Sequence, residues 1–208
     1  MSIRAAAWLL ALAALLPWPA EALEFRVQRD RNATIILASG PFERGDAQRL
    51  SALLRQTPNV DAIIFRSPGG NAMEGMEVGR VIRRAGLATH LPAGVSCASA
   101  CTYAFIGGTI RTMEPGARFG VHMFSASNNP ALQREVDRVI RAGGPRAAAE
   151  VIRFVEEQSA RFAAQLAYYA IEMGVSLRLL EPNFRTAHDD IHWLSARELR
   201  DLNVVNAD

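Results

Sequence analysis

The sequence has no lysine, because all 23 of its basic residues are arginines. This absence excludes chemistry that depends on a lysine amine, including a Ser–Lys dyad, a Schiff base and a phosphate-binding loop with its lysine. Arginine cannot take the place of lysine as a general base, since its guanidinium stays protonated. A nucleophilic serine in this chain therefore needs a histidine as its base. The only candidates are His90, His122, His188 and His192.

Cysteine is almost absent as well, with Cys97 and Cys101 as the only two. Such a pair predicts a disulfide in an exported protein. Four residues apart in a regular helix, the two Cα atoms lie about 6 Å from each other, in the upper part of the disulfide range. The bond forms more easily if Cys97 precedes the helix. The alternative is two small buried thiols. We expect no metal site, since two ligands one turn apart lack partners, and no cofactor.

Long hydrophobic runs are confined to the N-terminus. Arg4 is followed by the apolar stretch Ala5–Leu16, which is short for a membrane span, and then by the cleavage-type triplet Ala20-Glu21-Ala22. This pattern predicts that residues 1–22 are a signal peptide and that the protein is periplasmic or secreted. An uncleaved anchor helix is the alternative. Residues 23–208 suffice for a single domain with its own core.

Charge of one sign is not concentrated anywhere in the chain. The formal net charge is +2, and the basic residues form no stripe or run. Proteins that bind nucleic acids usually display such a basic patch. We therefore expect no nucleic-acid partner.

Strand-like and helix-like segments alternate over the first 122 residues. Such alternation predicts an α/β fold with a parallel sheet and right-handed crossovers. The expected strands are Leu23–Gln28, Thr34–Ala38, Asp61–Arg66, Leu87–Leu91 and, as the last, Arg118–His122; the expected helices are Asp46–Gln56, Ala72–Ala85 and Ser99–Ile106.

The pattern becomes helical after His122. Asn129 and Pro130 are typical of a helix N-cap and first turn. Helices are predicted over 131–142 and 146–173, separated by Gly143-Gly144-Pro145. The second helix carries an apolar stripe of Val151, Val155, Phe162, Leu166, Tyr169 and Met173. This stripe either packs on the sheet domain or forms an arm for self-association, and we favour a homo-oligomer.

Three segments could together supply the parts of an acyl-transfer site. Ser67-Pro68-Gly69-Gly70 follows a strand, and its glycines can leave backbone N–H groups open to a ligand. Ser99 opens an apolar helix among small residues, where it is either a nucleophile or a simple N-cap. Ser96 is the alternative nucleophile. His122 ends a strand downstream and is the candidate base.

The third member of a Ser–His–carboxylate site would be an acid that orients His122. Asp189 and Asp190 are the candidates, since they come just before the segment Ile191–Ser195 and a short predicted helix over 196–202. One of them can instead cap a turn while the other is solvated. The choice between the two stays open.

These segments resemble the Clp protease/crotonase superfamily, and within it the exported Clp-like proteins. The similarity is strong from Asp61 to His122 and weaker from Thr34 to the C-terminus. It implies a spiral of ββα units and a helical handle over 131–173. It also implies an oxyanion hole of Gly69, Gly70 and Ala100, with Gly69 shaping the turn and the other two donating N–H groups.

The resemblance favours an exported serine hydrolase, a peptidase acting on short or unfolded peptides through Ser99, His122 and one aspartate. No ATPase partner is expected outside the cytosol. A catalytically inactive binding or scaffold protein of the same fold is the main alternative, since a fold does not fix a function. Acyl-CoA chemistry is a third interpretation, which the lack of lysine for phosphate binding disfavours.

Overall fold

The computed structural model describes residues 22–29, 33–125 and 130–207. The expected signal peptide and the expected N-cap at Asn129 lie outside these residues. Among the helices in the described ranges, none combines the length and the apolar character that a membrane span needs.

The main sheet has five strands in the order β1-β2-β3-β4-β6. They span Glu24–Arg29, Thr34–Ser39, Ala62–Arg66, Ala88–Leu91 and Arg111–Met113. β2, β3, β4 and β6 run parallel, whereas β1 pairs antiparallel with β2. The expectation of an entirely parallel sheet is therefore wrong at this edge. The link between β1 and β2 is too short for a crossover, so the two strands form a hairpin.

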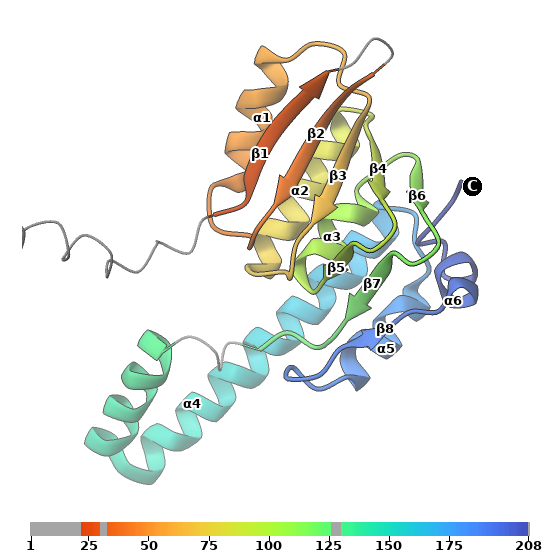
Figure 1. The fold of residues 1–208 in the computed structure, drawn as a ribbon. Helices are drawn as coiled ribbons and strands as arrows, with labels where there is room; N and C mark the ends of the chain where they lie inside the picture. Colours follow the sequence, from red (N-terminus) through yellow and green to blue (C-terminus); the bar gives the residue numbers. More distant parts are fainter. Residues whose placement is uncertain (1–21, 30–32, 126–129, 208) are drawn as a thin grey trace, which may run out of the picture.

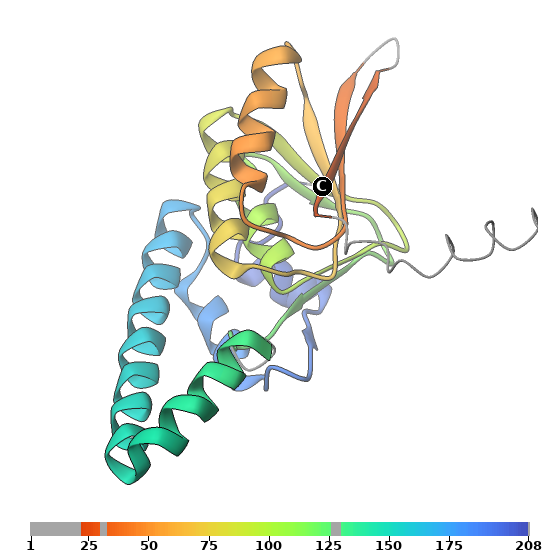
Figure 2. The ribbon, with the colours of Figure 1, turned by 90° about the vertical axis from the view of Figure 1, so that its left-hand side faces the viewer.

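Three helices cover one face of this sheet, namely α1 (Asp46–Gln56), α2 (Ala72–Arg84) and α3 (Ala100–Ile106) (Figure 2). Each follows a strand, so the mixed α/β architecture predicted from the alternation is confirmed. The layer between sheet and helices is the hydrophobic core. Its fully buried members include Ile36, Leu50, Ile63, Phe65, Ile82 and Phe105.

A second, smaller sheet joins β5 (Ser96–Ala98), β7 (Arg118–Val121) and β8 (His192–Trp193). The prediction that the strand at Arg118 is the last one is wrong, because β8 follows it and pairs with it antiparallel. β5 runs parallel to β7, with Ala98 opposite Gly120. This sheet brings the ends of β5 and β7, and thus Ser99 and His122, to the same region of the molecule.

The helical arm α4 (Pro130–Glu172) extends away from both sheets (Figure 1). It contains the predicted break, since Gly144 has the non-helical angles φ 61° and ψ −149°. The C-terminal part of α4 packs on the sheet domain, where the Tyr169 hydroxyl donates to the Tyr103 carbonyl at 2.7 Å. The chain then continues through η1 (Leu177–Leu179), α5 (Leu180–Arg185), β8 and α6 (Ala196–Asp201).

Candidate active site

The turn after β3 leaves one backbone N–H without a partner. Phe42 pairs with Gly70 in a parallel bridge, donating its N–H to the Gly69 carbonyl and accepting from Asn71 N–H, both at 2.8 Å. In such a bridge the N–H of the paired residue points to the opposite side. Within the described residues, the Gly70 N–H donates to no protein acceptor. It is therefore available to a negatively charged oxygen, as an oxyanion hole requires.

Gly69 allows this turn to lie against Ser99. Its φ of +112° is one that side chains rarely adopt, and its N–H is held by the Ser67 hydroxyl at 3.1 Å. A Cβ added at Gly69 would lie 2.5 Å from Ser99 Cβ and 3.1 Å from Ser99 Oγ. A glycine is required here for both reasons. The structure thus brings the predicted turn and the predicted nucleophile together.

Ser99 stands in the N-cap position of α3, but its side chain makes no capping hydrogen bond. Its backbone has φ 55° and ψ −126°, a conformation that costs a non-glycine residue about 1–3 kcal/mol and is typically found at functional sites. Its N–H donates to the Gly120 carbonyl at 3.0 Å, which ties the turn to β7. Simple helix capping therefore does not explain Ser99. Its strained strand-to-helix turn is typical of an exposed nucleophile.

The helix behind Ser99 is fixed by close packing. Every residue of α3 is buried. α2 approaches it so closely at Gly75 that a Cβ there would overlap the Ala100 carbonyl oxygen. Ala100 is the first residue of α3, so its N–H has no acceptor within the helix. That Ala100 and Gly70 together donate to an oxyanion stays a prediction of the resemblance.

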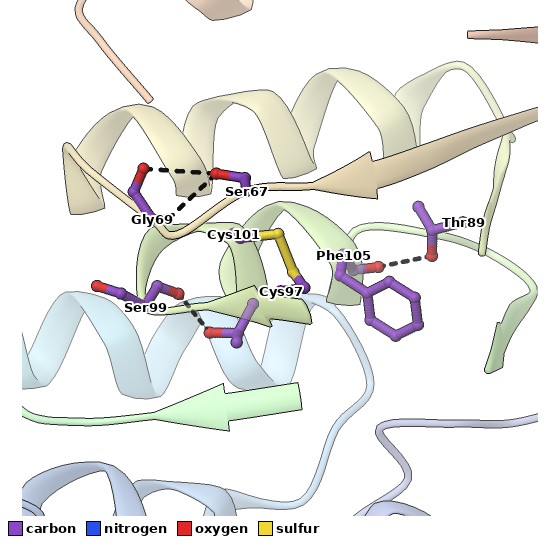
Figure 3. The surroundings of a disulfide bond; sticks show 8 residues. Ser67, Gly69, Thr89, Cys97, Ser99, Cys101 and Phe105 are labelled. Carbon is purple, nitrogen blue, oxygen red and sulfur yellow. Dashed lines mark hydrogen bonds between the residues drawn. A yellow bond between two sulfur atoms is a disulfide. The ribbon is translucent and has the colours of Figure 1, made fainter. Parts of the chain in front are cut away.

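A disulfide joins Cys97 to Cys101 across Ser99 (Figure 3). The two Cα atoms lie 5.3 Å apart, and both cysteines are fully buried. Cys97 belongs to β5 rather than to the helix, which is the arrangement that makes the bond easy. The predicted disulfide is confirmed, and the alternative of two free thiols is wrong. Ser96, the alternative nucleophile, lies on β5, where its carbonyl accepts from Ser67 N–H.

His122 follows β7 and is half-buried. Burial lowers its pKa below the usual 6.5, and repulsion from His188 lowers it further, whereas the backbone of Met123 raises it. These effects favour the neutral imidazole, which is the form that a general base needs. Within the part of the chain that the structure describes, the buried Nδ1 atom of His122 has no hydrogen-bond partner.

Neither candidate aspartate reaches this ring nitrogen. Asp189 and Asp190 are both exposed, and the Asp190 carboxylate accepts from the N–H of Ile191 at 2.7 Å. Since Nδ1 of His122 is unpartnered, neither carboxylate orients it in this structure. His188, one of the four histidines considered as a base, lies in the same segment, and its repulsion of the imidazolium contributes to the lowered pKa of His122.

Comparison with known proteins identifies the fold but gives no closer relative. No family model matches the chain, and no curated protein matches it. Among solved structures, ClpP1 from Listeria monocytogenes matches with a TM-score of 0.54 and 18% identity, over 83% of this chain and 88% of that one. A mutant of the 1510-N membrane-bound stomatin-specific protease matches with a TM-score of 0.48 and 19% identity, over 82% and 75%. The ClpP1 match and the mixed α/β architecture together show that this chain has a ClpP-like fold.

Proposed function

We propose that the protein is an exported serine hydrolase, and specifically an ATP-independent peptidase acting on short or unfolded peptides. One observation carries the proposal. The Ser99 hydroxyl caps no helix, its backbone is strained, and the Gly69-Gly70 turn with a free N–H lies against it. A serine that served only as the N-cap of a helix would not be expected to combine these features.

In the proposed reaction, Ser99 Oγ attacks the substrate carbonyl carbon while His122 accepts its proton. The resulting oxyanion is stabilised by the N–H groups of Gly70 and Ala100. His122 then protonates the leaving amine, and water attacks the acyl group by the same route in reverse. Asp189 or Asp190 is the proposed partner of His122 Nδ1. Either aspartate can reach this atom only if the segment before β8 moves, which we propose happens when substrate binds or subunits assemble.

A second candidate is a catalytically inactive binding protein of the same fold. The observation that favours it is the missing contact between His122 Nδ1 and a carboxylate. An unoriented imidazole samples the wrong tautomer and the wrong ring position, which lowers catalysis strongly in a Ser–His–Asp site. The two functions differ in whether Ser99 reacts with an electrophile.

Labelling with a fluorophosphonate probe distinguishes them. Ser99 Oγ would bond to phosphorus, fluoride would leave, and His122 would take the hydroxyl proton. We expect the wild type to be labelled, and Ser99→Ala and His122→Ala to lose labelling by at least a hundredfold while staying folded. Ser96→Ala is the matched control and should be labelled like the wild type. Labelling retained in Ser99→Ala would disprove the assignment of the nucleophile, and a folded, unlabelled wild type would favour the inactive protein.

The proposal also includes homo-oligomerisation through the arm. Residues 152, 155, 159, 162, 166 and 169 recur at alternating steps of three and four, so they share one face of the second helix of α4. Phe162, Leu166 and Tyr169 on this face are buried against the sheet domain, but Ile152 and Val155 are 59% and 53% exposed. A second copy of the chain is the proposed cover for this exposed continuation.

A further inference from the structure

The small sheet has one face that the core does not use. Side chains alternate along a strand, so Cys97 and Phe119 enter the core while their neighbours face the other way. The register sets Ser96 beside Arg118, and Gly120 between Ala98 and Trp193. A hollow of about 520 Å³ lies over this face, lined by Arg66, Pro68, Ser96, Ala98, Ile191 and Trp193 among others. We call it the Trp193 hollow.

The indole of Trp193 is held in place on β7. A Cβ added at Gly120 would lie 2.7 Å from the Cε3 atom of Trp193, so only glycine lets the ring lie so close to the strand. The Arg118 guanidinium carbon lies 3.8 Å from the centre of this ring. A guanidinium stacked on an aromatic face keeps its N–H groups in the plane, where they can still donate to a ligand.

Two arginines give the hollow a positive charge: Arg66 is one of its lining residues, and Arg118 is not but lies over the ring of Trp193, which is. Within the described residues, neither Arg66 nor Arg118 forms an ion pair, and both are exposed. The hollow has no acidic residue among its lining residues. Asp190 directly precedes Ile191, but its carboxylate accepts a hydrogen bond from the backbone N–H of Ile191. By contrast, Arg80 on α2 is bound by two glutamates, Glu77 and Glu172.

We propose that the Trp193 hollow binds a carboxylate carried by a peptide segment. Arg66 and Arg118 supply the donors for the carboxylate, and planar guanidinium groups match its geometry. Ala98, Ile191 and Trp193 supply apolar surface for the aliphatic part of the ligand. The hollow begins at Ser67-Pro68, the start of the turn that lies against Ser99, so a peptide bound there lies beside the candidate active site. The site itself does not depend on Ser99 being reactive.

Trp193 fluorescence provides a direct test. The chain has three tryptophans, and Trp8 and Trp18 lie in the expected signal peptide, so Trp193 is the only reporter in the protein over residues 23–208. The probes are the blocked peptide acetyl-Ala-Ala-Glu-Ala-amide and its glutamine counterpart, together with Ala-Ala-Ala as free acid and as amide. The first pair tests a side-chain carboxylate, and the second pair tests a C-terminal one. We expect a saturable change in emission with at least one acid, and none with the matched amide.

Variants identify the groups responsible. Arg66→Gln does not touch the tryptophan and should weaken binding of the acidic peptide about tenfold, the effect of losing one charge-assisted hydrogen bond. Arg118→Lys keeps the charge but loses the planar stack, and should also weaken it. Arg84→Gln removes the same charge from the exposed end of α2 and serves as the control.

Three results would overturn the proposal. They are an equal response to acid and amide, unchanged affinity in both hollow variants, and competition by inorganic phosphate as strong as that of the acidic peptide. The fluorescence readout does not involve Ser99. A protein that binds the peptide but is not labelled by the fluorophosphonate would therefore refute the hydrolase and support the carboxylate site. A protein that is labelled but does not bind the peptide would support the hydrolase and refute the carboxylate site.

Discussion

The turn around Ser99 and the outer part of α4 differ in how contacts within the chain stabilise them. Around Ser99, a disulfide, the buried helix α3 and two close glycine contacts constrain a strained backbone. In the arm, Ile152, Phe154 and Val155 are each more than half exposed, although they are apolar. The first region is stabilised by contacts within the chain. The second has apolar side chains that no other described part of the chain covers, and this is the surface that we propose a second copy binds.

Removing the disulfide is expected to have the largest effect on the region around Ser99. Closing a loop of five residues is worth about 2 kcal/mol in the unfolding free energy, so Cys97→Ala with Cys101→Ala should lower it by about that amount. Because the bond also restrains the unfavourable backbone of Ser99, we expect the fluorophosphonate labelling rate to fall at least about tenfold. Denaturant unfolding and labelling kinetics measure the two effects.

A variant that is destabilised at another position distinguishes the positioning of Ser99 by the disulfide from a general loss of unfolding free energy. Leu50→Ala in α1 removes a fully buried side chain far from Ser99 and should cost about 2–5 kcal/mol. Its labelling rate at a temperature where the protein is folded should stay at the wild-type value. Hydrogen exchange at Ser99 and Thr102, whose N–H groups bond to Gly120 and to Ser99, gives a readout that needs no reactivity. If exchange and labelling in the cysteine variant match those of Leu50→Ala, the disulfide does not position Ser99.

In the arm, the expected effect is on assembly and not on folding. Ile152→Glu with Val155→Glu should convert an oligomer to a monomer in light scattering, because charges would replace the exposed apolar seam. The monomer should keep its native circular dichroism, since exposed substitutions usually change stability by no more than about 0.5 kcal/mol. Ala164→Glu, on the exposed face of the same helix, is the control. A wild type that is already monomeric would contradict the proposed role of the arm.

The sequence predicts the long, strongly patterned elements well. α1 has the predicted bounds, and the break at Gly144 lies within the predicted triplet. The short strands β5, β6 and β8 have two or three residues each, too few to show a period, so the small sheet could not be predicted. The Trp193 hollow could not be predicted either, because it depends on the pairing of β7 with β8, and these two strands are far apart in the chain.

The candidate site was predictable only in part. The order of Gly69-Gly70, Ser99 and His122 indicated an acyl-transfer site, but whether a serine hydroxyl caps its helix depends on backbone angles that no local pattern encodes. Spacing alone gave two candidates for a carboxylate partner of His122, and both Asp189 and Asp190 are exposed and make no contact with its Nδ1 atom. His188 was considered only as a base, and its influence on His122 could not be predicted, because it depends on how the chain after α5 returns to β7.

The smallest predicted effect is a shift in a pH profile, and it tests whether His188 influences the base. Burial lowers the pKa of His122, so the labelling rate should decline on acidification only when the pH falls below 6.5, as the imidazole becomes protonated. Electrostatic repulsion from His188 contributes to this lowering. His188→Gln removes that repulsion, so the midpoint of the decline should move to higher pH while the rate at alkaline pH stays the same. His192→Gln is the control, because His192 contacts Glu198 at 3.0 Å instead. An unchanged midpoint in His188→Gln would mean that burial alone sets the pKa of His122, and the segment before β8 would then have no electrostatic part in the site.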